Sequence, residues 1–448
     1  MSRILVLSII AASLLACPRP RPMFDGGEEM DAGMEVDAGR PRGDDPTNGW
    51  QTAVELPMFA TAAATTHLGV QLASAGDQFG QPLIAGVFED PNGDGLYDDN
   101  RVVFTRWDGV ARAFTMLKTV EVIGGGAADD TRPSRQVSIA RDATTGRIAI
   151  AYIKPQDNTV RIAVSDDEAA NFSLSTVSDV PRAALMSNPS LALAGGNAHL
   201  AWIQGSELMY RKRLGAATTW TDVPAGAIVV NGNSVSLALD ADGNAGIAFF
   251  VNAGLNMADL AYWHPPAQAA VAVSGNMIDL SIARERAPSV SLTFVGNVPH
   301  VAYHLRTVEP LATNDNTTEL SYAKADSAAA ATWTVIPIPR NGSATTFHTT
   351  RWYQSIFIEP TGRVNIAANF GANGAQSNCG GPKLSRAADG MNFMTCAPVG
   401  YPTQFAGEWI SMWSHRPGKL TIIFAYDAPT GSRSNAMLKP GIAMWREP

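Results

Sequence analysis

The residues with the clearest potential for chemistry lie in an acidic loop at positions 89–99, which reads E-D-P-N-G-D-G-L-Y-D-D. Oxygen atoms at alternate positions of such a loop, with a glycine that permits a tight turn, suit Ca²⁺. We therefore expect a structural calcium ion bound by the side chains of Asp90, Asn92, Asp94 and Asp98 and by the carbonyl oxygen of Leu96. The alternative is an acidic turn that binds no metal.

A second group of candidates combines arginines, one carboxylate and aromatic rings. Such groups hold sugars and anionic ligands when a fold brings them together. The group consists of residues that lead into the innermost strands of the fold expected below, namely Arg135, Arg351, Trp352, Tyr353, Glu408 and Trp409. In the alternative interpretation, the rings fill the centre of the fold and the charged groups are solvated or paired.

Sequence motifs of the common catalytic sites are not found in this chain. It has no G-x-S-x-G elbow, P-loop or zinc-protease motif. His300 and His304 lie four residues apart, but a pair without further ligands is weak evidence for zinc. The formal net charge is −8, and no basic stripe of the kind that phosphate backbones require is visible. The sequence therefore favours binding over catalysis and argues against nucleic acid as a partner.

A repeated unit supplies the elements that would position these residues. Each copy has a hydrophobic-Ser-hydrophobic stretch, a turn and a second hydrophobic stretch that tends to end in an aromatic residue. Short β-rich runs separated by Gly-containing turns predict hairpins. The clear copies span 137–152, 235–249, 290–303 and 354–368, and the weaker ones span 70–88, 191–202 and 410–424.

The chain after each hairpin predicts two more strands, the last of which opens with an aromatic residue such as Trp220 or Trp333. Seven four-stranded units, with six as the alternative count, predict one all-β propeller over residues 49–448. The rival fold is a linear solenoid. The last unit stops after its third strand, however, and G-W-Q-T-A-V at 49–54 matches the missing fourth. We expect the N-terminal strand to complete the last blade and close the ring, which would bring no advantage to a solenoid.

The step from third to fourth strand carries a further motif. It reads D-G-x-x-x-x-F at Asp108, Gly109 and Phe114, S-R-A-A-D-G-M-N-F at 385–393 and S-D-D-E-A-A-N-F at 165–172. These copies resemble degenerate Asp-boxes of bacterial sialidase propellers, and the resemblance implies that each stabilises a hairpin. The acidic loop at 89–99 similarly resembles the calcium loops of integrin-type propellers. Sialidases have six blades and an early F/Y-R-I-P motif, which this chain lacks.

The order of strands in such units divides the turns between two faces. Connections between second and third strands would lie on the same face as those between blades, and they vary in length, as at 305–318, 371–382 and 427–440. Variable loops on a rigid scaffold commonly bind ligands. Cys379 and Cys396 would lie near this face, and in an oxidising compartment we expect them to form a disulfide, with two free thiols as the alternative.

The N-terminus predicts export and anchoring. Arg3, a short apolar run and Leu14-Leu15-Ala16-Cys17 resemble the signal peptide and lipobox of bacterial lipoproteins. The resemblance implies removal of residues 1–16 and lipidation of Cys17, with a plain secretory signal as the alternative. Residues 17–48 are rich in Pro, Gly and acids and are expected to form a disordered tether. We thus expect a monomer held by its lipid to a bacterial envelope membrane, with the outer membrane favoured.

Two functions remain open from the sequence. The first is a binding or scaffold module of the cell envelope, with a glycan or a protein as its ligand. The second is a sialidase-type glycoside hydrolase, which needs an arginine cluster, a tyrosine nucleophile and carboxylates. Only Arg135, Arg351, Tyr353 and Glu408 are loose candidates for those roles.

Overall fold

The structure is a computed structural model of the whole chain. It describes residues 54–55, 67–78, 81–89, 100–108, 113–124, 137–154, 157, 159–179, 189–215, 217, 219–225, 228, 230–254, 257–267, 269–279, 289–307, 317–338, 350–370, 381–393, 397–398, 406–416, 419–427 and 438–446. Two compact units divide the chain at residues 41 and 42, and all described residues belong to the second. Within this described part, no helix is long and apolar enough to cross a membrane.

The described strands form antiparallel four-stranded sheets, so the all-β prediction is confirmed. Seven such sheets are present. The first three contain β2 (His67–Gly76), β3 (Pro82–Glu89), β4 (Arg101–Asp108) and β5 (Ala113–Val122); β6 (Val137–Arg141), β7 (Ile148–Lys154), β8 (Thr159–Ser165) and β9 (Ser173–Asp179); and β10 (Ser190–Ala194), β11 (Asn197–Gln204), β12 (Glu207–Arg213) and β13 (Thr221–Asp222).

The next three sheets follow the same sequential order. They contain β14 (Val230–Leu239), β15 (Ala245–Gly254), β16 (Met257–Trp263) and β17 (Val271–Asp279); β18 (Val290–Val295), β19 (Val298–Thr307), β20 (Thr317–Ala325) and β21 (Trp333–Pro337); and β22 (Thr350–Ile358), β23 (Val364–Phe370), β24 (Gly381–Ala387) and β25 (Ala397–Pro398).

The last sheet joins the two ends of the described chain. Its order is β1 (Val54–Glu55), β28 (Leu438–Arg446), β27 (Lys419–Asp427) and β26 (Ala406–Arg416). β1 pairs antiparallel with β28, with Val54 opposite Ile442. The expected pairing of an N-terminal strand with the last sheet is therefore observed for these two residues, whereas Trp50 lies outside the described residues.

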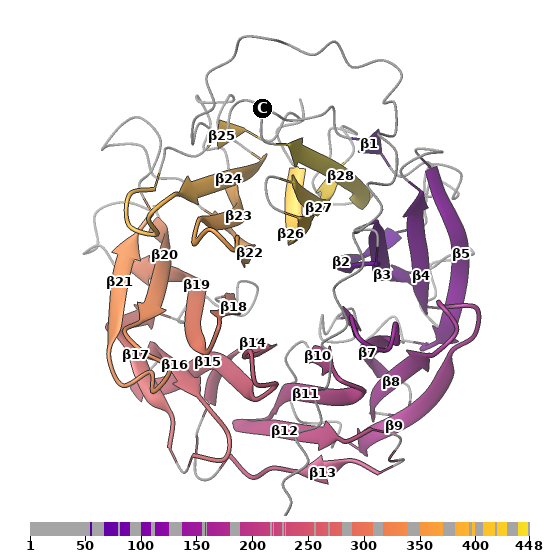
Figure 1. The fold of residues 1–448 in the computed structure, drawn as a ribbon, viewed down its shortest axis with the longest axis horizontal. Helices are drawn as coiled ribbons and strands as arrows, with labels where there is room; N and C mark the ends of the chain where they lie inside the picture. The colour runs from indigo at the N-terminus through magenta and orange to yellow at the C-terminus, as the bar shows by residue number, and fades with distance from the viewer. Residues whose placement is uncertain are drawn as a thin grey trace, which may run out of the picture. The chain divides into compact units, whose positions relative to one another are not determined.

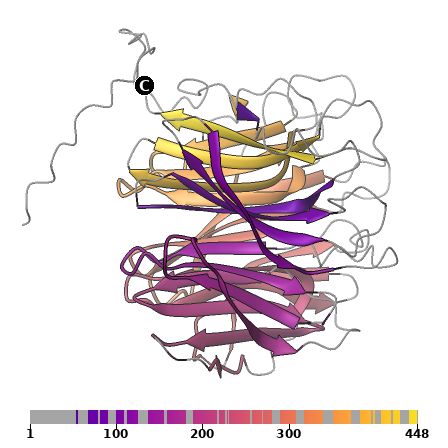
Figure 2. The same ribbon diagram turned by 90° about the vertical axis from the view of Figure 1, so that its right-hand side faces the viewer.

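Successive sheets contact one another through their first strands. β2, β6, β10, β14, β18, β22 and β26 contact each other in this order, and β26 also contacts β2 (Figure 1). Seen from the side, the strands run between two faces (Figure 2). One face carries the turns that link first to second strands and third to fourth strands, and we call it the turn face. The loop face carries the links from second to third strands and between sheets.

Serine side chains join the first strands. Each sheet has a partly exposed serine at the same place in its first strand: Ser74, Ser138, Ser190, Ser236, Ser291, Ser355 and Ser411. From β6 onward, the Oγ atom of this serine accepts the backbone N–H of the next first strand; the Met412 N to Ser355 Oγ distance, for example, is 3.0 Å. Between the last and first sheets, Ser74 Oγ donates to Ser411 Oγ at 2.7 Å. The repeated hydrophobic-Ser-hydrophobic stretch thus places one polar link at each of these sheet boundaries.

The core lies between neighbouring sheets, where the second strands are almost wholly buried. In β7, for example, every residue from Ile148 to Ile153 is buried. Gly246 on β15 is needed for such packing, because a Cβ atom there would lie 2.5 Å from Phe294 Cζ and 2.7 Å from the Tyr262 hydroxyl. Tyr262 belongs to the same sheet and Phe294 to the next one, so this glycine permits a close approach between two sheets.

Two fourth strands differ from the sequence prediction. β17 opens with Val271 rather than an aromatic residue, so the aromatic rule did not find it. β25 begins at Ala397, and Phe393 instead packs in the core beside Tyr322 of the preceding sheet, with ring centroids 5.6 Å apart. The aromatic residue is therefore selected by the space between two sheets and not by the start of the strand.

Candidate functional site

The first strands of the last two sheets hold most of the predicted ligand-binding residues. Arg351, Trp352 and Tyr353 lie in β22, and Glu408 and Trp409 lie in β26. These strands contact each other, and the bond from Met412 N to Ser355 Oγ sets their relative level. Counting back four residues from that bond reaches Arg351 on β22 and Glu408 on β26, at the loop-face ends of both strands. The structure therefore places the two segments at the same ends of two strands that contact each other.

The local backbone of both segments is irregular. The pairing of β22 with β23 shifts register between Arg351 and Gln354, and the pairing of β26 with β27 shifts on both sides of Glu408. Such bulges redirect side chains and are frequent next to binding sites. The side chains of these five residues, and the whole of Arg135, lie outside the described part of the structure.

Several other predicted sites also lie outside the described residues. They are the calcium loop with Asp90, Asn92, Asp94, Leu96 and Asp98, the lipidation site Cys17, and the cysteine pair Cys379 and Cys396. Calcium binding, lipidation and the disulfide stay predictions. Among the residues that the structure does describe, no cluster of three or more metal-binding side chains is present.

Gln354, the residue after Tyr353 in β22, belongs to a buried polar network that sequence reasoning missed. Ser289 Oγ donates to Gln354 Oε1 and lies 3.2 Å from His304 Nδ1. Gln354 Nε2 donates to the carbonyl oxygens of Ser289 at 2.6 Å and Ala302 at 3.0 Å. Ser289, His304 and Gln354 are all buried, and they join the sheet of β18–β21 to that of β22–β25. The network thereby holds the start of β22 in place.

The burial of His304 changes its acid–base behaviour. Burial lowers the pKa of its imidazole to about 4, although a hydrogen bond with Gln354 opposes that shift. The imidazole is therefore neutral at neutral pH. His300 lies on the same strand, β19, four residues closer to the turn face. It is also buried, but its Nδ1 atom lies 2.5 Å from the Tyr322 hydroxyl. It serves the packing of its own sheet.

A second polar cluster lies at the loop-face ends of β5 and β7. The Tyr152 hydroxyl donates to Glu121 Oε2, and Lys154 Nζ and Arg161 Nη2 lie 3.0 and 3.1 Å from Glu121 Oε1. Burial and the hydrogen bond to Glu121 raise the pKa of Tyr152. A tyrosine paired with a carboxylate and flanked by an arginine has the composition that sialidase-type hydrolysis needs. Tyr152 is 0% exposed, however, so its hydroxyl is not open to a substrate.

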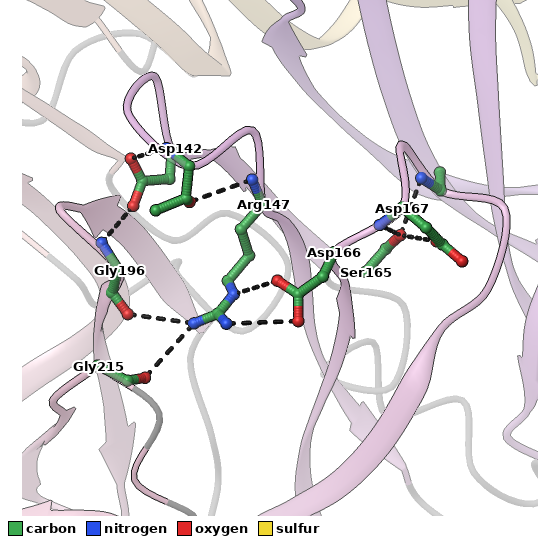
Figure 3. A network of polar contacts seen from close by, with 9 residues as sticks. Asp142, Arg147, Ser165, Asp166, Asp167, Gly196 and Gly215 are labelled. Atoms are coloured by element: carbon green, nitrogen blue, oxygen red, sulfur yellow. Dashed lines mark hydrogen bonds and ion pairs between the residues drawn. The ribbon is translucent and has the colours of Figure 1, made fainter.

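On the turn face, a network of charged side chains joins two sheets (Figure 3). Arg147 Nε donates to Asp166 Oδ1 at 2.6 Å, and Arg147 Nη1 donates to the Gly196 carbonyl at 3.2 Å. Asp142 Oδ2 accepts the Gly196 N–H at 2.5 Å. Burial would raise the pKa of Asp142, but backbone N–H donors, led by that of Gly196, lower it overall. Both carboxylates in this network accept hydrogen bonds from protein donors. The contacts with Gly196 connect the sheet of β6–β9 with that of β10–β13.

Two of the three hairpins with the repeated Asp motif are described in full. Asp167 Oδ1 accepts the Ser165 hydroxyl at 2.7 Å (Figure 3). It also accepts the Asn171 N–H at 2.8 Å. Asp389 Oδ1 accepts the N–H groups of Met391 and Asn392, both at 2.8 Å. These bonds, with that from the backbone of Asn171 or Asn392 as the largest cause, lower the pKa of each carboxyl to about 2. Both carboxylates therefore hold their own turns.

No protein-family model matches this chain, and no curated protein matches it. Solved structures do match it. An ulvan lyase from a new polysaccharide lyase family has a TM-score of 0.54 at 11% identity and covers 87% of this chain and 95% of its own. The BP39L lectin from Burkholderia pseudomallei has a TM-score of 0.50 at 13% identity, with 80% and 92% covered. The intramolecular trans-sialidase from Ruminococcus gnavus reaches 0.40 at 9% identity, with 67% and 89% covered. At these identities the similarity to the ulvan lyase and the BP39L lectin shows the fold alone, which is all-β and propeller-like.

Proposed function

We propose that this chain is a lipid-anchored cell-envelope protein whose propeller binds a glycan at its loop face. The observation that carries this proposal is the contact between β22, which contains Arg351, Trp352 and Tyr353, and β26, which contains Glu408 and Trp409. Aromatic and charged groups on adjacent rigid strands suit sugar rings and their acidic substituents. The lectin and polysaccharide lyase that share the fold act on saccharides, which supports a glycan over a protein ligand.

The scaffold we propose is one closed, seven-bladed propeller. Seven sheets, the cyclic order of contacts between their first strands and the bond between Ser74 and Ser411 support this arrangement. The turns at Asp167 and Asp389, held by their own carboxylates, support a relationship to Asp-box hairpins. Because all first strands would begin on one face, residues 351–353 and 408–409 would surround the mouth of a central channel.

Sialidase-type hydrolysis finds less support than binding. The described tyrosine–carboxylate pair, Tyr152 with Glu121, is buried between two sheets. A fluorogenic sialoside incubated with the protein and calcium tests this alternative, and we expect no release of the fluorophore. Release that depends on Tyr353 would instead establish hydrolysis.

A glycan array tests the binding proposal. The protein for this test is the chain from residue 17 with Cys17→Ser, which leaves it unlipidated. We expect it to bind a restricted set of glycans, and the variant Arg351→Ala/Tyr353→Ala to lose at least about 90% of that signal. Arg211→Ala is the matched control, since Arg211 is paired with Asp222 at the outer edge of another sheet. No binding by the parent chain, or equal loss in both variants, would refute the proposed site.

The anchor is proposed from Cys17 and the residues before it. In a bacterial host, the parent chain is expected in the detergent phase after Triton X-114 partition, because several acyl chains give stable membrane attachment. The Cys17→Ser variant is expected in the aqueous phase. Detergent-phase recovery of that variant would show that attachment does not depend on the lipid.

Calcium binding and the disulfide are proposed as structural supports of the loop face. Addition of EDTA is expected to lower the melting temperature of the parent chain, because a ligand that binds only the folded state stabilises it. The Asp94→Asn/Asp98→Asn variant is expected to show no response to EDTA. Non-reducing peptide mapping is expected to recover Cys379 and Cys396 in one linked pair.

A further inference from the structure

A small hollow opens on the turn face where the sheet of β2–β5 meets the sheet of β6–β9. It is lined by residues of both sheets, which include Asp77, Gln78 and Arg106 from the first and Arg141, Gly146 and Glu168 from the second. Its volume is about 260 Å³, which includes the solvent at its open mouth. The hollow therefore has room for one small polar group and not for an extended ligand.

Arg141 brings to this hollow a positive charge that no described residue neutralises. Its side chain is partly exposed, and its guanidinium has no hydrogen-bond or ion-pair partner among the described residues. A Cβ atom on Gly146 would lie 3.8 Å from Arg141 Nη2, so this glycine leaves the space beside the guanidinium free. A guanidinium stays charged and presents several N–H donors, which suits an anionic acceptor.

Two carboxylates line the same hollow, and they differ in how firmly they are held. Asp77 Oδ1 accepts the Gln81 N–H at 2.8 Å and so holds its own turn. Glu168 Oε2 lies 3.7 Å from Arg106 Nη1, and the Glu168 side chain is 69% exposed. An ion pair that is open to water and too long for a hydrogen bond contributes little to stability. The Glu168 carboxylate can therefore leave Arg106 at small cost.

The backbone holds Glu168 at this position in a conformation that residues with a side chain avoid. Its φ angle is +55°, and that of Ala169 is +68°. In the corresponding turn of the sheet β18–β21, Ala330 has a φ of +52°, but the residue before it has no such angle. Lys118 on β5 donates to the carbonyl oxygens of Ala169 and Ala170, so the first sheet helps to hold the turn of the second. Strain of this kind is frequent at binding sites.

We propose that this hollow binds a carboxylate group between Arg106 and Arg141, and that the bound group replaces the Glu168 side chain beside Arg106. The Glu168 carboxylate already shows the kind of acceptor that lies next to Arg106. Once Glu168 has turned to solvent, the two guanidiniums and Asp77 leave one net positive charge, which a single carboxylate neutralises. Such a group belongs to a small organic acid or to an acidic sugar unit. The site lies on the turn face, so it does not depend on the binding proposed for the loop face.

The test uses the chain from residue 17 with Cys17→Ser, labelled with ¹⁵N-arginine and kept at constant ionic strength. The probes are acetate and glucuronate, with chloride as the ion control. We expect the Nε–H resonances of Arg106 and Arg141 to move saturably with the carboxylates and not with chloride. The resonance of Arg213, which lies over the Trp220 ring at the turn-face end of β12, should not move. Tighter binding of glucuronate than of acetate would identify an acidic sugar unit, and equal affinity a small organic acid.

Three variants separate a binding site from a surface charge effect. Arg141→Gln is expected to weaken binding at least about tenfold, because it removes a charge-assisted hydrogen bond. Arg213→Gln is the matched control, since it removes the same charge from the same face, and it should change affinity less than about twofold. Glu168→Gln is expected to tighten binding, because a neutral amide competes less for Arg106.

The result in the parent chain decides the proposal even where a variant does not fold. If neither arginine resonance moves saturably with acetate or glucuronate, or if chloride moves them equally, the hollow is not a carboxylate site. Equal losses in Arg141→Gln and Arg213→Gln would also overturn it. Weaker binding by Glu168→Gln would show that the bound group does not replace that side chain.

Discussion

The protonation of three buried histidines affects the stability of this fold. Burial, aided by nearby Lys212 and Lys324, lowers the pKa values of His199 and His300 to about 4, and burial does the same for His304. An unfolded histidine titrates near 6.5. The unfolded chain therefore binds more protons below that pH, and stability falls as the pH drops from 6.5 to 4.

The size of this effect can be measured in a variant. Each histidine contributes up to about 3 kcal/mol of lost stability once the pH reaches 4, from about 1.4 kcal/mol per pH unit. We expect urea unfolding at pH 4.5–7.5 to show that the free energy of unfolding depends less steeply on pH in His300→Gln than in the parent chain. The difference in slope should correspond to up to about one bound proton. Parallel curves for the two proteins would show that His300 is not held neutral in the fold.

A buried ion pair is the second residue-level feature with a clear energetic consequence. Arg386 Nη2 lies 3.2 Å from Glu359 Oε1, and Asn365 bonds to both side chains. Glu359→Leu removes this carboxylate from the buried Arg386 guanidinium, which costs about 3–5 kcal/mol, whereas in Arg386→Met the Glu359 carboxylate keeps Arg363 Nη1 at 3.7 Å. We expect Glu359→Leu to lose this much unfolding free energy in urea, and Glu359→Leu/Arg386→Met to lose less. A double variant as unstable as the sum of both single changes would contradict this.

At the level of the strands, the contribution of the serine links between first strands to the free energy of unfolding can be measured. Ser355→Ala leaves the Met412 N–H without its acceptor and is expected to cost about 1 kcal/mol. Ser236→Ala should behave similarly toward Leu292, and the two changes should add, because the sites lie on different sheet boundaries. Ser173→Ala, an exposed change on the outer strand β9, is the control and should be neutral in the same urea titrations.

For the protein as a whole, the pairing of β1 with β28 connects the two ends of the chain. Without β1, the backbone of β28 becomes an open edge that favours aggregation. Deletion of residues 49–56 is expected to lower the melting temperature by several degrees and to increase aggregation in size-exclusion chromatography. Deletion of residues 40–47 is the length-matched control and should change neither. Equal behaviour of both deletions would show that β1 does not stabilise the last sheet.

Much of the strand pattern could be read from the chain, because a hairpin depends on local alternation and on the turn between its strands. The serines of the first strands in the clear copies and the two halves of the last sheet were visible in this way. The starts of β17 and β25 were missed, because the position of the aromatic residue near a fourth strand depends on the space between two sheets and not on where the strand begins. Phe393 illustrates this, as its ring packs on Tyr322 of another sheet.

The polar networks could not be foreseen, because their members meet only when sheets pack side by side. Ser289 and Gln354 are 65 positions apart, and Glu121 and Tyr152 are 31 apart, with no periodicity that relates them. Local sequence specifies which strands form and which face of each is apolar. The partner that a buried hydroxyl or imidazole finds across a sheet boundary depends on the packing of whole sheets, as the bond between Ser289 and Gln354 shows.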